Sequence, residues 1–281
     1  MAIACSIGAK VLDPGRAVVL YKNRDLARPR FDDRVVYTPR LFALEGIERW
    51  DASGGAGRYL GFSAGINAAG LACADANVAT RPGAASSGVL VQLVLERCES
   101  IFEAVRLLEV ETVQRPYSWA NLVLADRHGV AAVEVRDRAR VVLHPRQINR
   151  ANHHLAWRPE PSPCDQDTTT TRWRYQTARN LLDQVDSVEA ILRLCRSHDP
   201  QPGPLSLCRH GEYTTVYSHV FAWQEGQAAL WVCQGSPCQG EYRRLSLRFP
   251  AAATEIAATL RDYPSRFTCA PVAPTLKGAL P

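Results

Sequence analysis

Short apolar runs separated by turn residues dominate the first third of the sequence. Residues 5–11 and 17–22 are two such runs, and Asp13-Pro14-Gly15 between them is a strong turn signal, so together they predict a β-hairpin. Residues 34–43 and 58–66 predict two further strands. The N-terminal part of the chain is therefore expected to form β-sheet.

Helical periodicity, with apolar residues every three or four positions, begins only after this region. Four helices preceded by serine or threonine are predicted: from Ser86 or Ser87 to about Cys98, after Ser100, after Thr168–Thr171 to about Leu182, and from Ser187 to about Cys195. Further strands are predicted at 119–126, 130–136, 140–144, 213–222, 227–233 and 242–248, followed by a last helix at 252–261.

The order of these elements is strands, two helices, strands, two helices, strands. A doubly wound parallel sheet would instead alternate single strands and helices. The order predicts an α+β fold, a four-layer α/β/β/α sandwich of two antiparallel sheets with helices on both outer sides. We expect one domain over residues 5–262, a short preceding segment (1–4) and a proline-rich tail (263–281).

Composition narrows the possible functions. The chain has 281 residues, of which 46% are apolar and 22% charged, so it can bury a large core and is not expected to be disordered. The net charge is +5, but the arginines are scattered and no aromatic-basic module appears, so we expect no nucleic-acid partner. Neither a bilayer-spanning apolar stretch nor a signal peptide is visible, so we expect a cytoplasmic protein with no membrane contact.

The cysteines indicate reduced thiols. Nine cysteines are an odd number, and without a visible secretion signal they favour free thiols over a disulfide framework. Cys233 and Cys238 are five residues apart, which is the wrong spacing for a zinc knuckle, and no paired Cys/His group accompanies them. We therefore expect neither a metal nor a cofactor.

Cys5 is the candidate nucleophile, because it lies almost at the start of the chain and the next strand ends in the tetrad of residues 22–25, Lys-Asn-Arg-Asp. In N-terminal nucleophile chemistry the α-amine of the first residue accepts the proton of its own side chain. We expect Asp25 to orient this amine and Lys22 to lower the pKa of the thiol by its charge, with Arg24 as a rival for the second role.

Five stretches, in order along the chain, carry a resemblance to a known family. They are Cys5-Ser6 with the tetrad, Gly65–Leu71 (Gly-x-Asn-x-x-Gly-Leu), Asn121–Asp126 with Gly129 and Glu134, Ala151–His154, and the C-terminal motifs between Cys208 and Cys238. The sequence resembles the acyl-coenzyme A:6-aminopenicillanic acid acyltransferase family, which is related to the choloylglycine (bile-salt) hydrolases. The resemblance spans about residues 5–245 and implies the N-terminal nucleophile hydrolase fold. One departure is Lys22, where the family usually has arginine.

The resemblance also implies roles for other residues. The backbone N–H of Asn67 and the side-chain amide of Asn152 would form the oxyanion hole, which stabilises the charge on a tetrahedral intermediate. Arg172 would support the nucleophile from the start of a helix, although Arg174 and an ordinary surface role compete with this interpretation. His153 and His154 would serve packing and hydrogen bonding, because adjacent residues of a strand face opposite ways.

The implied activity is hydrolysis of the acyl-amide bond of a small molecule, through a thioester on Cys5. It requires the autocatalytic removal of residues 1–4, since otherwise Cys5 has no α-amine. Acyl transfer to an amine shares every step up to the thioester and is one alternative. A non-catalytic binding protein on the same fold is another, and a Cys5–His210 dyad is a third.

Overall fold

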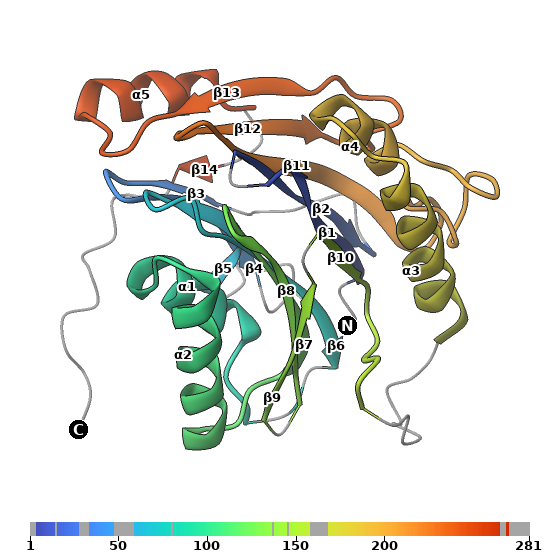
Figure 1. Ribbon diagram of the computed structural model, residues 1–281. Helices are drawn as coiled ribbons and strands as arrows, with labels where there is room; N and C mark the ends of the chain where they lie inside the picture. The colour runs from blue at the N-terminus through green and yellow to red at the C-terminus, as the bar shows by residue number, and fades with distance from the viewer. Residues whose placement is uncertain are drawn as a thin grey trace.

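Two β-sheets lie face to face, with helices over the outer side of each (Figure 1). The structure is a computed structural model, and it describes residues 4–14, 16–27, 34–47, 59–79, 81, 83–136, 138–144, 146–157, 168–264 and 268–269. This arrangement confirms the predicted α/β/β/α sandwich. Residues 52–57 and 158–166, whose glycine- or proline-rich sequence predicts loops, lie outside the described residues.

The six-stranded sheet contains the strand with Cys5. Its order is β10 (Gln147–Arg150), β1 (Ala4–Asp13), β2 (Ala17–Leu26), β11 (Thr214–Gln224), β12 (Gln227–Gln234) and β13 (Arg243–Leu247), and all neighbours are antiparallel. Helices α3 (Thr168–Asp183) and α4 (Val188–Cys195) pack on its outer face. Apolar side chains such as Val19, Tyr21 and Ile191 fill the space between this sheet and the helices.

The eight-stranded sheet forms the other half of the sandwich. Its order is β14 (Thr268–Cys269), β3 (Arg34–Tyr37), β4 (Leu41–Ile47), β5 (Tyr59–Asn67), β6 (Ala72–Ala79), β7 (Trp119–Asp126), β8 (Gly129–Val135) and β9 (Ala139–His144). Helices α1 (Ser87–Arg97) and α2 (Ile101–Gln114) cover its outer face, while α5 (Ala253–Asp262) lies near β13 (Figure 1). Among the described strands, only β14 and β3 pair in parallel.

The helix starts agree closely with the sequence prediction. The side chains of Ser86, Ser100 and Ser187 accept hydrogen bonds from backbone N–H groups in the first turns of α1, α2 and α4. These N–H groups have no partner within the helix, so a serine hydroxyl that binds one of them favours a helix beginning at that residue.

Two strand predictions differ from the structure. The single strand predicted at 34–43 is divided into β3 and β4, because the hydroxyl of Thr38 accepts hydrogen bonds from the N–H groups of Arg40 and Leu41 and turns the chain at Pro39. Strand β10 was not predicted, and its four residues are too few to show a clear period. Among the described residues, no helix is long and apolar enough to cross a membrane.

The register of β1 and β2 positions the nucleophile. Cys5 lies opposite Arg24, and Ala4 lies opposite Asp25. Successive side chains of a strand point to opposite faces of a sheet. Cys5 therefore faces the core between the two sheets, as Ile7 and Ala9 of the same strand do. Asp25 faces the layer of α3 and α4.

Candidate active site

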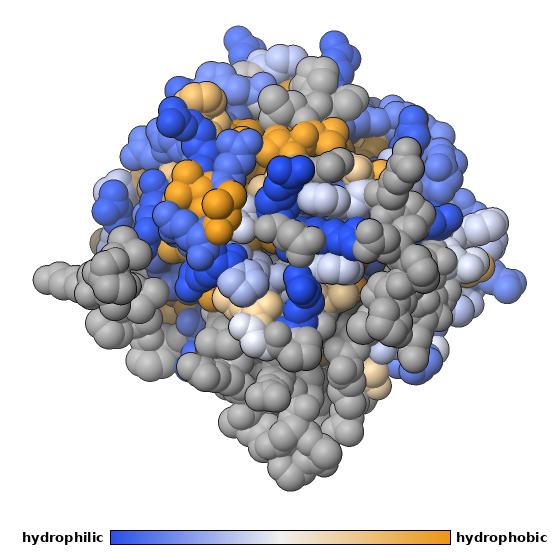
Figure 2. Space-filling model, turned by 90° about the horizontal axis from the view of Figure 1, so that it is seen from below, coloured by the Kyte–Doolittle hydropathy of each residue, from blue (hydrophilic) through white to orange (hydrophobic). Residues whose placement is uncertain are grey.

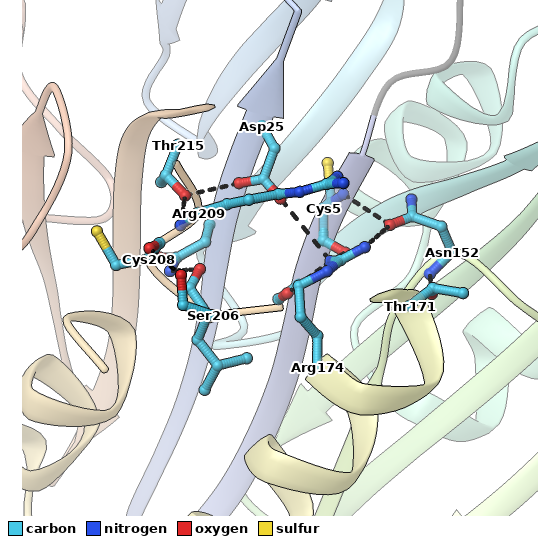
Figure 3. Close-up of polar contacts among 12 residues, drawn as sticks. Cys5, Asp25, Asn152, Thr171, Arg174, Ser206, Cys208, Arg209 and Thr215 are labelled. Carbon is cyan, nitrogen blue, oxygen red and sulfur yellow. Dashed lines mark hydrogen bonds and ion pairs between the residues drawn. The ribbon is translucent and has the colours of Figure 1, made fainter. Parts of the chain in front are cut away.

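The main chain of Cys5 is held by two polar side chains. Its N–H donates to Oδ1 of Asn152 at 3.0 Å, and its carbonyl oxygen accepts a 2.9 Å hydrogen bond from the guanidinium of Arg174. Figure 3 shows both side chains directed toward Cys5. The side chain of Cys5 is 1% exposed. Polar groups thus surround the nitrogen of Cys5 as well as its carbonyl.

Burial and charge act on the Cys5 thiol in opposite directions. Burial raises the pKa of the thiol, whereas the charges of Lys22 and Arg24 act to lower it. The ammonium of Lys22 donates to the carbonyl oxygen of Ser63 at 2.9 Å, and to the carbonyl and carboxylate oxygens of Asp75 at 2.7 and 2.8 Å. Burial is the largest of these effects, so the pKa of the Cys5 thiol lies above its ordinary value in the full-length chain.

Asp25 is a fully buried carboxylate on the other face of β2. Its Oδ1 accepts a 2.7 Å hydrogen bond from the hydroxyl of Thr215, and its Oδ2 lies 3.7 Å from Nη1 of Arg174. Burial raises the pKa of Asp25, while Arg174, Arg209 and the Thr215 hydrogen bond act to lower it. The side chains around Asp25 therefore favour its charged form at a place where burial alone would protonate it.

Arg174 occupies the place that we expected Arg172 to fill. Arg174 is 1% exposed and donates to the carbonyl of Cys5, the hydroxyl of Ser6 at 2.9 Å and Oδ1 of Asn152 at 2.9 Å. Arg172 is exposed on the opposite side of α3. A helix rotates about 100° per residue, so the buried positions Thr171 and Arg174 share a face that excludes Arg172.

Asn152 connects three elements, because it contacts Cys5 of β1, Asn77 of β6 and Thr171 of α3. Its Nδ2 donates to the carbonyl oxygen of Asn77 on β6 at 2.6 Å, and its backbone N–H donates to the hydroxyl of Thr171 at 2.7 Å. The side chain of Asn121 donates to the carbonyl oxygens of Ala151 and His153 on either side of it. The geometry thus brings Asn152 to Cys5, as the sequence interpretation requires.

Asn67 is not part of this cluster. Its backbone N–H donates to the carbonyl of Leu71, and its Nδ2 donates to the carbonyls of Leu95 and Cys98, so its groups hold the β5–β6 turn. Asn77 lies further along β6 and was missed by the sequence interpretation. Five residues of strand between Ala72, at the turn, and Asn77 amount to roughly 16 Å.

The backbone N–H and carbonyl of Asn77 point to the same side of β6, as they do for each residue of an antiparallel strand. Because the carbonyl of Asn77 accepts from Asn152, the N–H of Asn77 also points to the side of Asn152. Asn77 follows the Gly65–Leu71 motif in the sequence, but nothing in its local pattern distinguishes it from other strand residues.

The histidines lie apart from the thiol. Burial lowers the pKa of His153 to about 4, and its Nδ1 contacts the hydroxyl of Thr171 at 3.0 Å, whereas Nε2 of His154 contacts the carbonyl of Ala120. The two rings thus have different partners, although the segment after β10 is not the strand that the sequence interpretation assumed. His210 contacts His198 and two cysteines other than Cys5, which gives no support to a Cys5–His210 dyad.

The acidic residues of the β7–β8 hairpin hold neighbouring backbone segments. Glu134 accepts from Arg150 at 3.0 Å and from the backbone N–H groups of Leu155 and Ala156, and so holds the segment after Asn152. Asp126 accepts from the backbone N–H of Ile101 at the start of α2. Neither carboxylate contacts Cys5.

Substitutions at Asn152 and Asn67 are expected to separate catalysis from stability. If Asn152 donates to the oxyanion, as the resemblance implies, Asn152→Ala should lower kcat by about 10²–10³-fold in the folded protein. Asn67→Ala removes buried hydrogen bonds from a turn, so the free energy of unfolding should fall by about 2–3 kcal/mol with kcat unchanged. Steady-state kinetics and denaturant unfolding of both variants test this expectation. A large loss of kcat in Asn67→Ala at native stability would contradict the assignment.

Comparisons with known proteins bear on the family and the fold of this chain. Residues 11–237 match the family described as acyl-coenzyme A:6-aminopenicillanic acid acyl-transferase. Penicillin V acylase from Agrobacterium tumefaciens superposes with a TM-score of 0.50 and 14% identity, covering 86% of this chain and 86% of that chain. The Caenorhabditis elegans ortholog of N-acylethanolamine-hydrolyzing acid amidase gives a TM-score of 0.51 and 13% identity, covering 77% and 91%.

These comparisons support different conclusions. At such identities, the structural similarity shows a shared fold. No curated protein matches the sequence. The matched region begins after Cys5, so the assignment of the nucleophile depends on the contacts described above. Because the family match covers most of the sequence, as the ordered motifs predicted, the chain belongs to the acyl-coenzyme A:6-aminopenicillanic acid acyl-transferase family.

Proposed function

We propose that this protein is an N-terminal cysteine amidohydrolase, which cleaves an acyl-amide bond through a thioester on Cys5 after it has removed residues 1–4 from itself. The observation that carries the proposal is the hydrogen bond from the Cys5 nitrogen to Asn152, beside the buried pair of Arg174 and Asp25. Strand β10 pairs with β1 only at residues 7–10, so the partner of the Cys5 nitrogen is a polar side chain and not a strand. Trimming would leave this nitrogen as an α-amine that already has a polar partner.

The first reaction is the removal of residues 1–4. The sulfur of Cys5 attacks the carbonyl carbon of Ala4, the Ala4–Cys5 C–N bond breaks, and the Cys5 nitrogen takes the proton that the thiol releases. The product is a thioester between the Ala4 carbonyl and the sulfur. Water hydrolyses the thioester, which releases the peptide of residues 1–4 and leaves a free thiol and a free α-amine on Cys5.

The second reaction uses that amine. Asn152 accepts a hydrogen bond from it, and the guanidinium of Arg174 opposes its protonation, which favours the neutral form that acts as a base. The amine takes the thiol proton, the sulfur attacks the substrate carbonyl, and the proton then passes to the leaving amine as the C–N bond breaks. Asn152 and the N–H of Asn77 are the donors for the oxyanion. Water hydrolyses the thioester to release the acid.

Acyl transfer is the second candidate, because the matching family is named for an acyl-transferase. The two activities differ only in whether an amine or water takes the acyl group from the thioester. The lower side of the molecule, viewed in Figure 2, carries hydrophobic patches among hydrophilic side chains.

Trapping of the acyl group tests the proposed function. We expect N-acyl anilides of increasing chain length to release aniline when mixed with the trimmed protein. After acid quenching, peptide mass spectrometry should find the acyl group on Cys5. Addition of a small primary amine should divert the acyl group to a new amide if the enzyme is a transferase. If a trimmed preparation neither releases aniline nor carries an acyl group, the protein is a binding protein on this fold.

A further inference from the structure

Two histidines and two cysteines converge on one point away from Cys5. His198 follows α4, Cys208 and His210 precede β11, and Cys238 follows β12. One side-chain nitrogen or sulfur from each lies within 4.8 Å of all the others. We call these four residues the Cys–His cluster. The proposed reaction uses none of them.

The distances within the cluster do not fit hydrogen bonding alone. Nε2 of His210 lies 3.0 Å from Nε2 of His198, 3.7 Å from the sulfur of Cys208 and 3.4 Å from the sulfur of Cys238. An imidazole nitrogen has either one hydrogen or one lone pair in the ring plane, so it cannot make three hydrogen bonds at once. A single atom at the centre of the four groups would account for their convergence.

We propose that the Cys–His cluster binds one zinc ion. Zinc in structural sites takes four nitrogen and sulfur ligands in a tetrahedron, with bonds of about 2.0–2.3 Å, which places neighbouring ligand atoms about 3.3–3.8 Å apart. The three contacts of His210 lie close to this range. Two thiolates also balance the charge of the ion. With four protein ligands the site has no open position for a substrate, so its role is structural.

The zinc would fix the loop that supports Asp25. Arg209 lies between two of the ligands, and its N–H donates at 2.8 Å to the hydroxyl of Thr215, which in turn donates to Asp25 at 2.7 Å (Figure 3). The fourth ligand, Cys238, comes from the turn after β12, so the ion would join two loops that are distant in the sequence. This role goes beyond the proposed reaction.

The proposed zinc site differs from the sequence-based expectation that the chain binds no metal. That expectation considered Cys238 with Cys233, whose spacing is wrong for zinc. The structure instead brings Cys238 to His198, Cys208 and His210, and the 27 residues between His210 and Cys238 hide this grouping from a search for short motifs.

Metal analysis of the purified, thiol-reduced full-length protein tests the proposal. We expect roughly one zinc ion per chain, and Co²⁺ added to the chelator-treated protein should give the visible d–d and sulfur-to-metal charge-transfer bands of a tetrahedral thiolate site. In the double variant C208A/C238A, bound zinc should fall by about tenfold or more. The variants Cys73→Ala and His128→Ala, whose residues lie outside the cluster, should keep it.

A second measurement covers the case in which the double variant does not fold. Zinc should protect Cys208 and Cys238 of the wild-type chain from alkylation, and a chelator should remove that protection. A chain that binds no zinc at micromolar metal, or that carries a Cys208–Cys238 disulfide, overturns the proposal. So does undiminished zinc in the double variant. Cys5→Ala should retain zinc, so the outcome is independent of the proposed reaction.

Discussion

Cys5→Ala is expected to keep residues 1–4 attached and to lower turnover of an acyl amide by about 10⁴-fold or more. The same sulfur is the nucleophile of both reactions, and loss of a covalent nucleophile usually removes most of the catalysis by the residues that act with it. Intact-mass measurement detects the first effect, because the wild-type protein should lack the mass of Met1–Ala4. Steady-state kinetics measure the second.

Cys73→Ala is the matched control for this experiment. Cys73 is also a fully buried cysteine of a strand, and burial raises the pKa of its thiol as it does for Cys5. It lies in the core between the eight-stranded sheet and its helices. We expect this variant to be trimmed and active. A wild-type preparation that turns over substrate while it still carries residues 1–4 would refute the proposed α-amine base.

Trimming and turnover should also differ in their dependence on pH. During trimming, Cys5 has no α-amine, and burial raises the pKa of its thiol. The thiolate fraction, and with it the trimming rate, should therefore increase as the pH rises from neutral to alkaline. After trimming, the amine removes the thiol proton, so turnover should depend less on alkaline pH. Intact mass followed over time at several pH values provides the comparison.

The sequence predicted the layers of the fold because local signals determine them. A turn at residues 13–15 and serine N-caps at the helix starts locate elements from a few neighbouring residues. The proximity of Cys5 and Asp25 could also be predicted from the sequence, since a hairpin brings the start of one strand to the end of the next. Asn152 was found through a motif, and its contact with Cys5, which lies 147 positions earlier in the sequence, could not be derived from local patterns.

The errors concern residues whose role depends on long-range geometry. Asn67 has a conspicuous turn motif, yet Asn77 lies next to Asn152 because β6 runs on past the turn. The choice between Arg172 and Arg174, in contrast, could have been made from the sequence, because a local pattern distinguishes the two residues. Thr171, Arg174 and Ala178 have the spacing of one helix face, and this face is the buried one.

Arg174 contacts groups on both sides of β1. Its guanidinium binds the carbonyl of Cys5 and Oδ1 of Asn152, and it forms an ion pair with Asp25. It is also the strongest of the influences that lower the pKa of Asp25. Without Arg174, Asp25 would keep its burial and lose its main counter-charge, so it would take up a proton more readily.

Arg174→Ala is therefore expected to lower the free energy of unfolding by about 3–5 kcal/mol, because it leaves a buried carboxylate without its ion pair. Arg172→Ala is the matched control on the same helix, and its exposed side chain predicts a change within about 0.5 kcal/mol. Denaturant unfolding measures both effects.

If Arg174 also positions Cys5 and Asn152, its substitution should slow trimming as well as lower stability, which a purely structural role would not predict. Arg174→Lys keeps a positive charge beside Asp25 but lacks the planar fork that binds Cys5 and Asn152 together. We expect it to recover most of the stability while trimming of residues 1–4, followed by intact mass, stays slow. Equal trimming rates in Arg174→Lys and the wild type would limit Arg174 to stabilising the fold. If Arg172→Ala trims slowly at native stability, Arg172 and not Arg174 is the positioning residue.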